Sequence, residues 1–127
     1  MSKQKKQGTA HESWLVKRLN DFGYRARRLA EGGTRDEGDV EAWLPVRWVL
    51  EAKARSSLNI QKTLGDARRK AEQAAGEPVP VAVVWKRLVR VDGLQVRQPV
   101  NGERVVISMS LDDFLALLNR KEVNTSE

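Results

Sequence analysis

Hydrophobic and polar positions alternate along the chain with two different periods, and together they predict a mixed α/β fold. Apolar residues recur every three or four positions over residues 10–22 and 60–75, as they do in amphipathic helices. Shorter apolar or alternating runs predict strands at residues 24–30, 39–44, 46–54, 79–85, 88–91 and 104–109. A last helix, capped by Ser110, is expected over residues 111–118. This order of elements favours a mixed central β-sheet flanked by helices.

The first predicted helix has a start signal and a stop signal. Thr9 and Glu12 have the spacing of a capping box, so the helix is expected to begin near residue 10, and Gly23 is expected to end it. Its buried side is expected to consist of Trp14, Leu15, Leu19 and Phe22. His11 lies close to the chain end and is expected to be exposed to solvent.

The second predicted helix carries small residues on its apolar face, which indicates a close approach to a sheet. That face consists of Ile60, Leu64, Ala67, Ala71 and Ala74, and Gly76 is expected to end the helix. The two strands before this helix meet at Pro45 and are expected to form a hairpin. A loop rich in glycine and charge, residues 31–38, leads into that hairpin.

The length and composition indicate one intracellular domain. The 127 residues are expected to comprise a disordered basic tail (1–8), a single domain (9–119) and a polar tail (120–127). With no cysteine and one histidine, the chain has no disulfide, and a metal must be held by oxygen ligands, which suits magnesium and manganese. No apolar run is long enough to span a membrane, and no secretory signal is visible.

The net charge indicates an anionic partner. The chain carries 23 basic and 17 acidic residues, for a net charge of +6 and a pI near 10.0. Nucleic acid is the commonest polyanion inside a cell, although many small basic domains bind no particular partner.

Three residues of the predicted hairpin form a candidate catalytic site. Glu51 and Lys53 are two apart in a strand, so they share a face, and the hairpin brings Asp39 opposite them. Two carboxylates form the hard anionic site that Mg²⁺ prefers, and a nearby ammonium can stabilise charge on a phosphate. The alternative is a solvated strand face, since Glu-x-Lys pairs are common in a charged chain. Against it, residues 46–50 are strongly apolar, which makes charges at the end of this strand costly.

These residues also resemble a known family. Residues 38–42 (GDVEA) and 49–53 (VLEAK) resemble the core of the PD-(D/E)XK nuclease superfamily, and are similar in particular to archaeal-type and phage Holliday junction resolvases. The resemblance covers about residues 8–87, including an arginine-rich strand before the loop and a valine-rich strand after the second helix. Gly38 stands where the motif has proline, and the residues after Arg87 resemble nothing in the family.

The resemblance implies a restriction-endonuclease-like core and a set of site residues. Glu12, Asp39 and Glu51 would be ligands of Mg²⁺, for which Mn²⁺ would substitute, and Lys53 would be the catalytic lysine. Glu12 could instead act only as the helix cap, and both alternatives stay open. Asp36 is a second candidate ligand, although a loop residue that makes a turn is the simpler interpretation.

Basic residues near the site predict the DNA-binding surface. The candidates are Arg25, Arg27, Arg28 and Arg35 near the glycine-rich loop, and Arg55, Lys62 and Arg69 along the second helix, which Arg68 and Lys70 flank. The alternative for the helix is a solvated face balanced by Asp66 and Glu72. The tryptophans, Trp14, Trp43, Trp48 and Trp85, lie in apolar stretches and are expected in the core or in a dimer interface.

The expected function is a magnesium-dependent, structure-specific endonuclease that resolves four-way junctions or other branched DNA in recombination and repair. Symmetric cutting of two strands needs two sites, so a homodimer is expected, in the cytoplasm of a bacterium or a phage-infected host cell. One alternative is a nuclease acting on flaps, ends or duplex DNA in repair, replication or restriction. Another is a non-catalytic DNA-binding module with the same fold, for which magnesium would make no difference.

Overall fold

The computed structural model describes residues 3–29, 39–91, 94–96 and 105–126. The helices are α1 (Lys3–Asp21), α2 (Ile60–Ala75) and α3 (Leu111–Ser126). The strands are β1 (Ala26–Arg28), β2 (Val40–Trp43), β3 (Arg47–Arg55), β4 (Val81–Arg87), β5 (Val89–Val91), β6 (Leu94–Val96) and β7 (Val105–Ser108).

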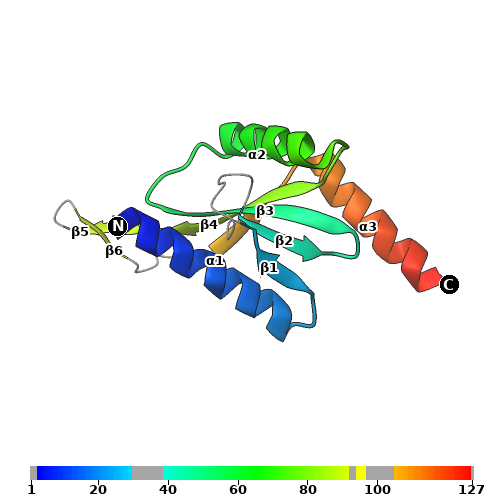
Figure 1. Ribbon diagram of the computed structural model, residues 1–127, viewed down its shortest axis with the longest axis horizontal. Coiled ribbons are helices and arrows are strands. Elements are labelled where there is room, and N and C mark those ends of the chain that lie inside the picture. The colour runs from blue at the N-terminus through cyan, green and yellow to red at the C-terminus, as the bar shows by residue number, and fades with distance from the viewer. Residues whose placement is uncertain (1–2, 30–38, 92–93, 97–104, 127) are drawn as a thin grey trace.

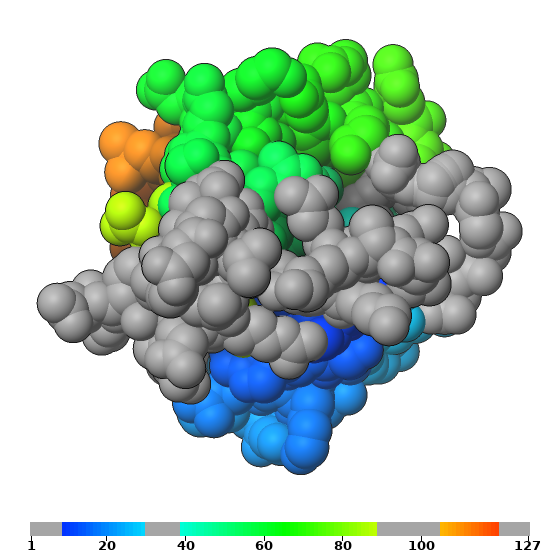
Figure 2. All heavy atoms as spheres, turned by 90° about the vertical axis from the view of Figure 1, so that its left-hand side faces the viewer, coloured from blue at the N-terminus to red at the C-terminus, as the bar shows by residue number. Residues whose placement is uncertain are grey.

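Within these residues, five strands form one mixed sheet in the order β1-β2-β3-β4-β7. β3 and β4 are parallel and are connected through α2, whereas the other neighbouring pairs are antiparallel. Helices α1 and α2 cover opposite faces of the sheet, and both views of the molecule show this arrangement (Figures 1 and 2). The predicted α/β class with a mixed sheet is therefore confirmed. Strand β6, which pairs with β5 in a separate hairpin, was not predicted.

Two apolar clusters fill the space between the sheet and its helices. On the α1 face, Leu15 packs with sheet residues that include Trp48, which is 2% exposed. On the α2 face, Ala71 packs with Val49 and Val81. Because Ala67 and Ala71 are both buried, the small-residue face of α2 allows the close approach that the sequence indicated. These clusters fix the two central strands, β3 and β4, between the helices.

The ends of α2 agree with the prediction. Asn59, which the sequence pattern had not marked, is the N-cap, and its side chain accepts a hydrogen bond from the backbone N–H of Lys62 at 3.0 Å. Gly76 ends the helix with a φ of 75°, a conformation that glycine adopts without steric cost. The hairpin is also confirmed, with Val40 paired to Leu50.

The predicted start of the first helix was wrong. Helix α1 begins at Lys3, so Thr9 and Glu12 lie inside it, where the backbone N–H groups already have helical partners and a capping box has no role. Residues 3–8, expected as a tail, are its first turns. The predicted buried side is only partly right, because Leu15 is buried whereas Trp14 and Phe22 are 45% and 68% exposed.

Helix α3 is longer than predicted. Ser110 caps it as expected, accepting a hydrogen bond from the N–H of Asp113 at 3.1 Å. The helix continues to Ser126, so residues 120–126, expected as a polar tail, are helical. In the described part of the chain, no helix is long and apolar enough to cross a membrane.

Candidate active site

Asp39 lies beside the middle of β3, as the hairpin predicted. It directly precedes β2, whose pairing with β3 ends at Val40 and Leu50. Its Oδ2 atom accepts a hydrogen bond from the backbone N–H of Ala52 at 2.8 Å. This bond fixes the Asp39 carboxylate next to Glu51 and Lys53, the residues on either side of Ala52.

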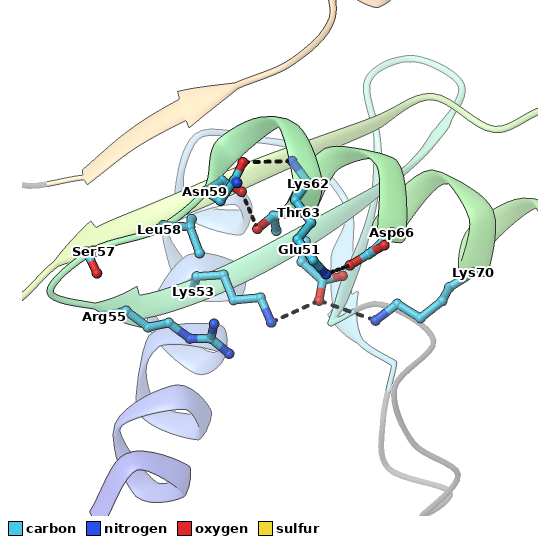
Figure 3. Close-up of a pocket in the computed structure, with 10 residues that line it drawn as sticks. All are labelled: Glu51, Lys53, Arg55, Ser57, Leu58, Asn59, Lys62, Thr63, Asp66 and Lys70. Atoms are coloured by element: carbon cyan, nitrogen blue, oxygen red, sulfur yellow. Dashed lines mark hydrogen bonds and ion pairs between the residues drawn. The ribbon is translucent and has the colours of Figure 1, made fainter.

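Glu51 and Lys53 share the α2 face of the sheet. The Glu51 residue is 4% exposed, and its Oε2 atom lies 3.3 Å from the Lys53 Nζ atom. The same oxygen lies 3.6 Å from Nζ of Lys70, which reaches it from α2, so that the two lysines approach from opposite sides (Figure 3). The other oxygen, Oε1, is buried and has no hydrogen-bond partner among the described residues. A buried carboxylate oxygen without a partner is costly unless a ligand satisfies it.

The surroundings of Asp39 disfavour its negative charge. Burial, followed by the nearby negative charges of Glu51 and Glu12, raises the pKa of Asp39 to about 7, while the Ala52 N–H and the Lys53 charge oppose the shift. The carboxylates therefore repel one another more than the nearby lysine compensates. A cation held between Asp39 and Glu51 would relieve that repulsion.

A pocket of about 660 Å³ opens beside Glu51, between β3 and the first turns of α2. Its charged lining consists of Glu51, Lys53, Arg55, Lys62, Asp66 and Lys70, and the remaining lining residues are Ser57, Leu58, Asn59 and Thr63 (Figure 3). Four cationic side chains against two carboxylates give the pocket a positive charge. A polyanion can therefore reach the buried Glu51 through a positively charged opening.

Glu12 lies on α1, and its Oε1 atom forms an ion pair with Nε of Arg28 at 3.1 Å. Its negative charge contributes to the raised pKa of Asp39. Within the described ranges, however, no group of three or more acidic or histidine side chains is arranged to hold a metal. The helix-cap alternative for Glu12 is excluded by the position of the residue inside α1, and its role as a metal ligand stays a prediction.

His11 was expected in solvent but is 3% exposed. Its Nε2 atom lies 3.1 Å from the carbonyl oxygen of Val84, and its ring stacks on Trp14 at 5.8 Å between centroids. Burial, and to a lesser degree the charge of Lys86, lowers the pKa of His11, although the Val84 carbonyl opposes the shift. His11 was mispredicted because the helix continues upstream of it and holds it against β4.

The arginines of the first strand do not all lie near Asp39. Arg28 pairs with Val40 and is adjacent to the site, but Arg25 lies beyond the other end of β1. The Arg25 guanidinium stacks on the Trp43 ring, 3.7 Å from its centroid. Arg25 therefore lies at the end of β1 away from Asp39, and its contact with DNA stays a prediction. Arg35 and Asp36 lie outside the described residues.

Arg27 forms an ion pair with the buried carboxylate of Glu41. Its guanidinium and that of Arg47 both contact Glu41, whose side chain is 3% exposed. Arg47 Nε lies 2.6 Å from Glu41 Oε1. Because Arg27 itself is 73% exposed, a contact with DNA remains compatible with this pairing, but the pairing gives Arg27 a structural role that the sequence did not reveal.

Replacing Glu41 with glutamine is expected to destabilise the protein by about 2 kcal/mol at pH 7, since it leaves both arginines without their counter-charge. Burial raises the pKa of Glu41, but the two arginines outweigh it and hold the pKa below the ordinary value of 4.5. The carboxylate thus adds stability above pH 4.5 that is lost as pH falls through the lowered pKa. Urea unfolding at pH 7 and pH 3 measures this effect. The free energies of unfolding of the wild type and the variant should differ less at pH 3 than at pH 7. An equal difference at both pH values would contradict this role.

The basic residues of α2 pair with acidic residues in three different places, on α2, α3 and β3. Lys62 and Arg69 both pair with Asp66, at 3.0 and 2.8 Å, and of these two only Lys62 lines the pocket. Arg68 pairs instead with Asp113 of α3 at 2.7 Å. Lys70, which the sequence placed only among flanking residues, contacts the candidate site. Arg55 lines the pocket at the end of β3.

The tryptophans and the valine-rich strand are mostly structural. Trp48 is in the core, and the indole N–H of Trp85 donates a hydrogen bond to the carbonyl of Arg55 at 2.9 Å. The valines of β4, from Val81 to Val84, are at most 4% exposed, so they belong to the core and offer no surface to a second copy of the chain.

Comparison with known proteins gives no family assignment for this chain. No protein-family model matches it, and no curated protein is significantly similar to it. The function is therefore inferred from the residues, their geometry and the motif that they resemble.

Proposed function

We propose that the chain is a metal-dependent DNA endonuclease of the PD-(D/E)XK type, with Asp39, Glu51 and Lys53 at its active site. The observation that carries this proposal is that Asp39, just before β2, accepts a hydrogen bond from the N–H of Ala52, which lies between Glu51 and Lys53. Glu51 and Lys53 form an ion pair and line a positively charged pocket. One oxygen of the buried Glu51 carboxylate has no hydrogen-bond partner among the described residues, and a bound cation would satisfy it.

The arrangement of the sheet supports a restriction-endonuclease-like core. The site residues lie on an antiparallel hairpin that continues, through the crossover helix α2, into the parallel strand β4. Helix α1 covers the other face of the sheet (Figure 1). The fold therefore holds the two central strands rigidly, and rigid elements are the most precise supports for catalytic side chains.

The residues at the site fit a hard divalent cation. Asp39 and Glu51 offer carboxylate oxygens, the ligands that Mg²⁺ and Mn²⁺ prefer, and neither thiolate nor a second imidazole is present in the chain. Mg²⁺ held there would polarise the scissile phosphate and lower the pKa of the attacking water.

The protein's own side chains bind and orient the substrate. Glu51 Oε2 holds the Lys53 ammonium at the pocket, where Lys53 can bind an oxygen of the scissile phosphate and stabilise its developing charge. The Ala52 N–H keeps the Asp39 carboxylate in place. Arg55 and Lys62, further along the same pocket, are placed to bind the neighbouring phosphates of the strand.

We propose branched DNA, and four-way junctions in particular, as the substrate. A junction is recognised through its shape and its phosphate path, which suits a small basic protein whose site is surrounded by lysine and arginine. The motif's similarity to junction resolvases supports the same choice. Flaps, ends and linear duplex are the alternative substrates for the same site, and a non-catalytic binding module is the alternative to an enzyme.

The test is cleavage of end-labelled four-way junction, flap, linear duplex and single strand by the purified protein, with Mg²⁺ and with EDTA. Paired, symmetric nicks in the junction that need Mg²⁺ would support the resolvase. Preferential cutting of flaps or linear DNA would keep the site and change the substrate. Binding of every substrate without cutting, under Mg²⁺ and Mn²⁺ alike, would leave only the binding module.

A resolvase acts on two strands, so we propose a homodimer that forms through α3. Leu111, Phe114, Leu115 and Leu118 follow a helical spacing on one face of α3 and are 43–68% exposed. Asp113 and Leu117, on the other side of α3, attach the helix to the body of the protein. Pairing this face with its copy would bury roughly 400 Å² on each chain, which fits a weak dimer that DNA stabilises.

Replacing Leu115 with glutamate is therefore expected to keep the protein monomeric, because it places two charges in the paired apolar face. Light scattering should give the wild type a mass that rises above 14.3 kDa with concentration, whereas the variant should stay at 14.3 kDa. Ala116→Glu, which adds the same charge at an exposed position off that face, is the control. A wild type that is monomeric at every concentration, free and on junction DNA, would refute the dimer.

A further inference from the structure

Two lysines from different elements meet at one carboxylate oxygen. Lys53 on β3 and Lys70 on α2 lie 3.3 and 3.6 Å from the Oε2 atom of Glu51. One ammonium is enough to balance the charge of one carboxylate. The second ammonium adds a positive charge on the side of Glu51 that faces the pocket (Figure 3).

Ion pairing within α2 does not explain where the Lys70 side chain lies. The acidic residue one turn earlier, Asp66, is already paired with Lys62 at 3.0 Å and with Arg69 at 2.8 Å. Lys70 instead extends across the pocket to the sheet. Surface pairs within a helix contribute little stability, but an ammonium held against a buried carboxylate is preorganised.

Both ammonium groups are accessible to a substrate. The side chains of Lys53 and Lys70 are 23% and 34% exposed, and both line the pocket, whereas the Glu51 side chain between them is 5% exposed. A phosphate that enters the pocket therefore meets two cations before it meets the carboxylate. Two cations on different elements can contact two different oxygens of one phosphate from two directions and place two full charges beside it.

We propose that Lys70 is a second catalytic lysine, which binds the scissile phosphate together with Lys53; this inference rests on the proposed nuclease function. Hydrolysis forms a bond from the water oxygen to phosphorus and breaks one P–O ester bond. The water loses a proton to solvent, and the departing sugar oxygen gains one. The non-bridging oxygens carry more negative charge in the transition state than in the substrate, so a fixed ammonium accelerates the reaction more than it tightens binding.

The test compares Lys70→Met with Lys70→Arg in single-turnover cleavage of the best DNA substrate with saturating Mg²⁺. Lys70→Met should lower the cleavage rate constant about 100-fold, the usual loss when one transition-state donor is removed. Lys70→Arg keeps the positive charge and should recover most of that loss. The dissociation constant for uncut DNA, measured in EDTA, should change by less than about threefold in both variants, since one phosphate contact contributes little to total affinity.

Lys17→Met is the matched control, because Lys17 is an exposed helix lysine paired with Asp21 on α1, away from the pocket. It should cleave at the wild-type rate. Lys70→Gln replaces Lys70→Met if thermal melting shows that the methionine variant is unfolded.

The outcomes separate this inference from the function on which it rests. A wild type that cuts no DNA with any divalent metal would remove the nuclease proposal itself. A wild type that cuts, together with a Lys70→Met variant that cuts equally fast, would overturn only the role of Lys70. Equal losses in Lys70→Arg and Lys70→Met would also overturn it, because they would assign Lys70 a packing role that needs lysine's shape and not its charge.

Discussion

Replacing Glu51 with alanine is expected to abolish DNA cleavage while the protein stays folded and binds DNA. The variant loses a proposed metal ligand and also the group that positions both Lys53 and Lys70. Because these contributions act together in the transition state, the single-turnover rate constant should fall by about 1,000-fold or more. The two lysines remain partly exposed, so their release into the pocket costs little stability.

The measurement is single-turnover cleavage of labelled junction DNA with Mg²⁺, next to a gel-shift titration without metal. Glu77→Ala removes a carboxylate from an exposed position outside the pocket and should cleave at the wild-type rate. A Glu51→Ala variant that is folded and cuts within about tenfold of the wild type would show that the catalytic centre lies elsewhere.

Replacing Asp39 with asparagine is expected to stabilise the metal-free protein at neutral pH while it removes cleavage. The pKa of Asp39 is raised to about 7 by burial and by Glu51 and Glu12, from an ordinary value of 3.8. Between these two values the folded state binds more protons than the unfolded state, so stability is full below pH 3.8 and falls as pH rises toward 7. Asparagine keeps an acceptor for the Ala52 N–H but does not ionise, so it avoids this loss.

The gain at pH 8 should be about 2 kcal/mol, which is less than the full shift would give, because Asp39 is partly exposed. Urea unfolding in EDTA at pH 4 and pH 8 measures this gain. The two proteins should have nearly the same free energy of unfolding at pH 4. Added Mg²⁺ should stabilise the wild type and not the variant. A variant that is less stable than the wild type at pH 8 in EDTA would mean that the negative charges around Asp39 are already compensated.

The elements with strong local signals were predicted from sequence. Helix α2 has a regular apolar spacing and ends at a glycine with positive φ, and the hairpin is defined by two apolar runs around Pro45. Since side chains two apart in a strand share a face, the hairpin alone was enough to bring Asp39 to Glu51 and Lys53. The local pattern therefore predicted that these three residues lie close together, and their catalytic role stays a prediction.

The features that depend on packing between distant elements were not predicted. A capping box at Thr9 and Glu12 was locally consistent, but the helix extends upstream to Lys3. Lys70 contacts Glu51 only because α2 crosses the sheet at a particular height and angle, which the helical period does not specify. The pairing of Arg27 with Glu41 likewise depends on the register between β1 and β2.

The central claim is that Asp39, Glu51 and Lys53 form a metal-dependent phosphodiesterase site, and one cleavage assay tests it most directly. The purified protein is incubated with a labelled four-way junction in Mg²⁺, then with excess EDTA, and then with Mg²⁺ restored. The proposed site predicts strand cleavage that proceeds in Mg²⁺, stops in EDTA and resumes when Mg²⁺ returns. A junction that is bound but stays intact in both Mg²⁺ and Mn²⁺, with flap and duplex DNA also uncut, would contradict it.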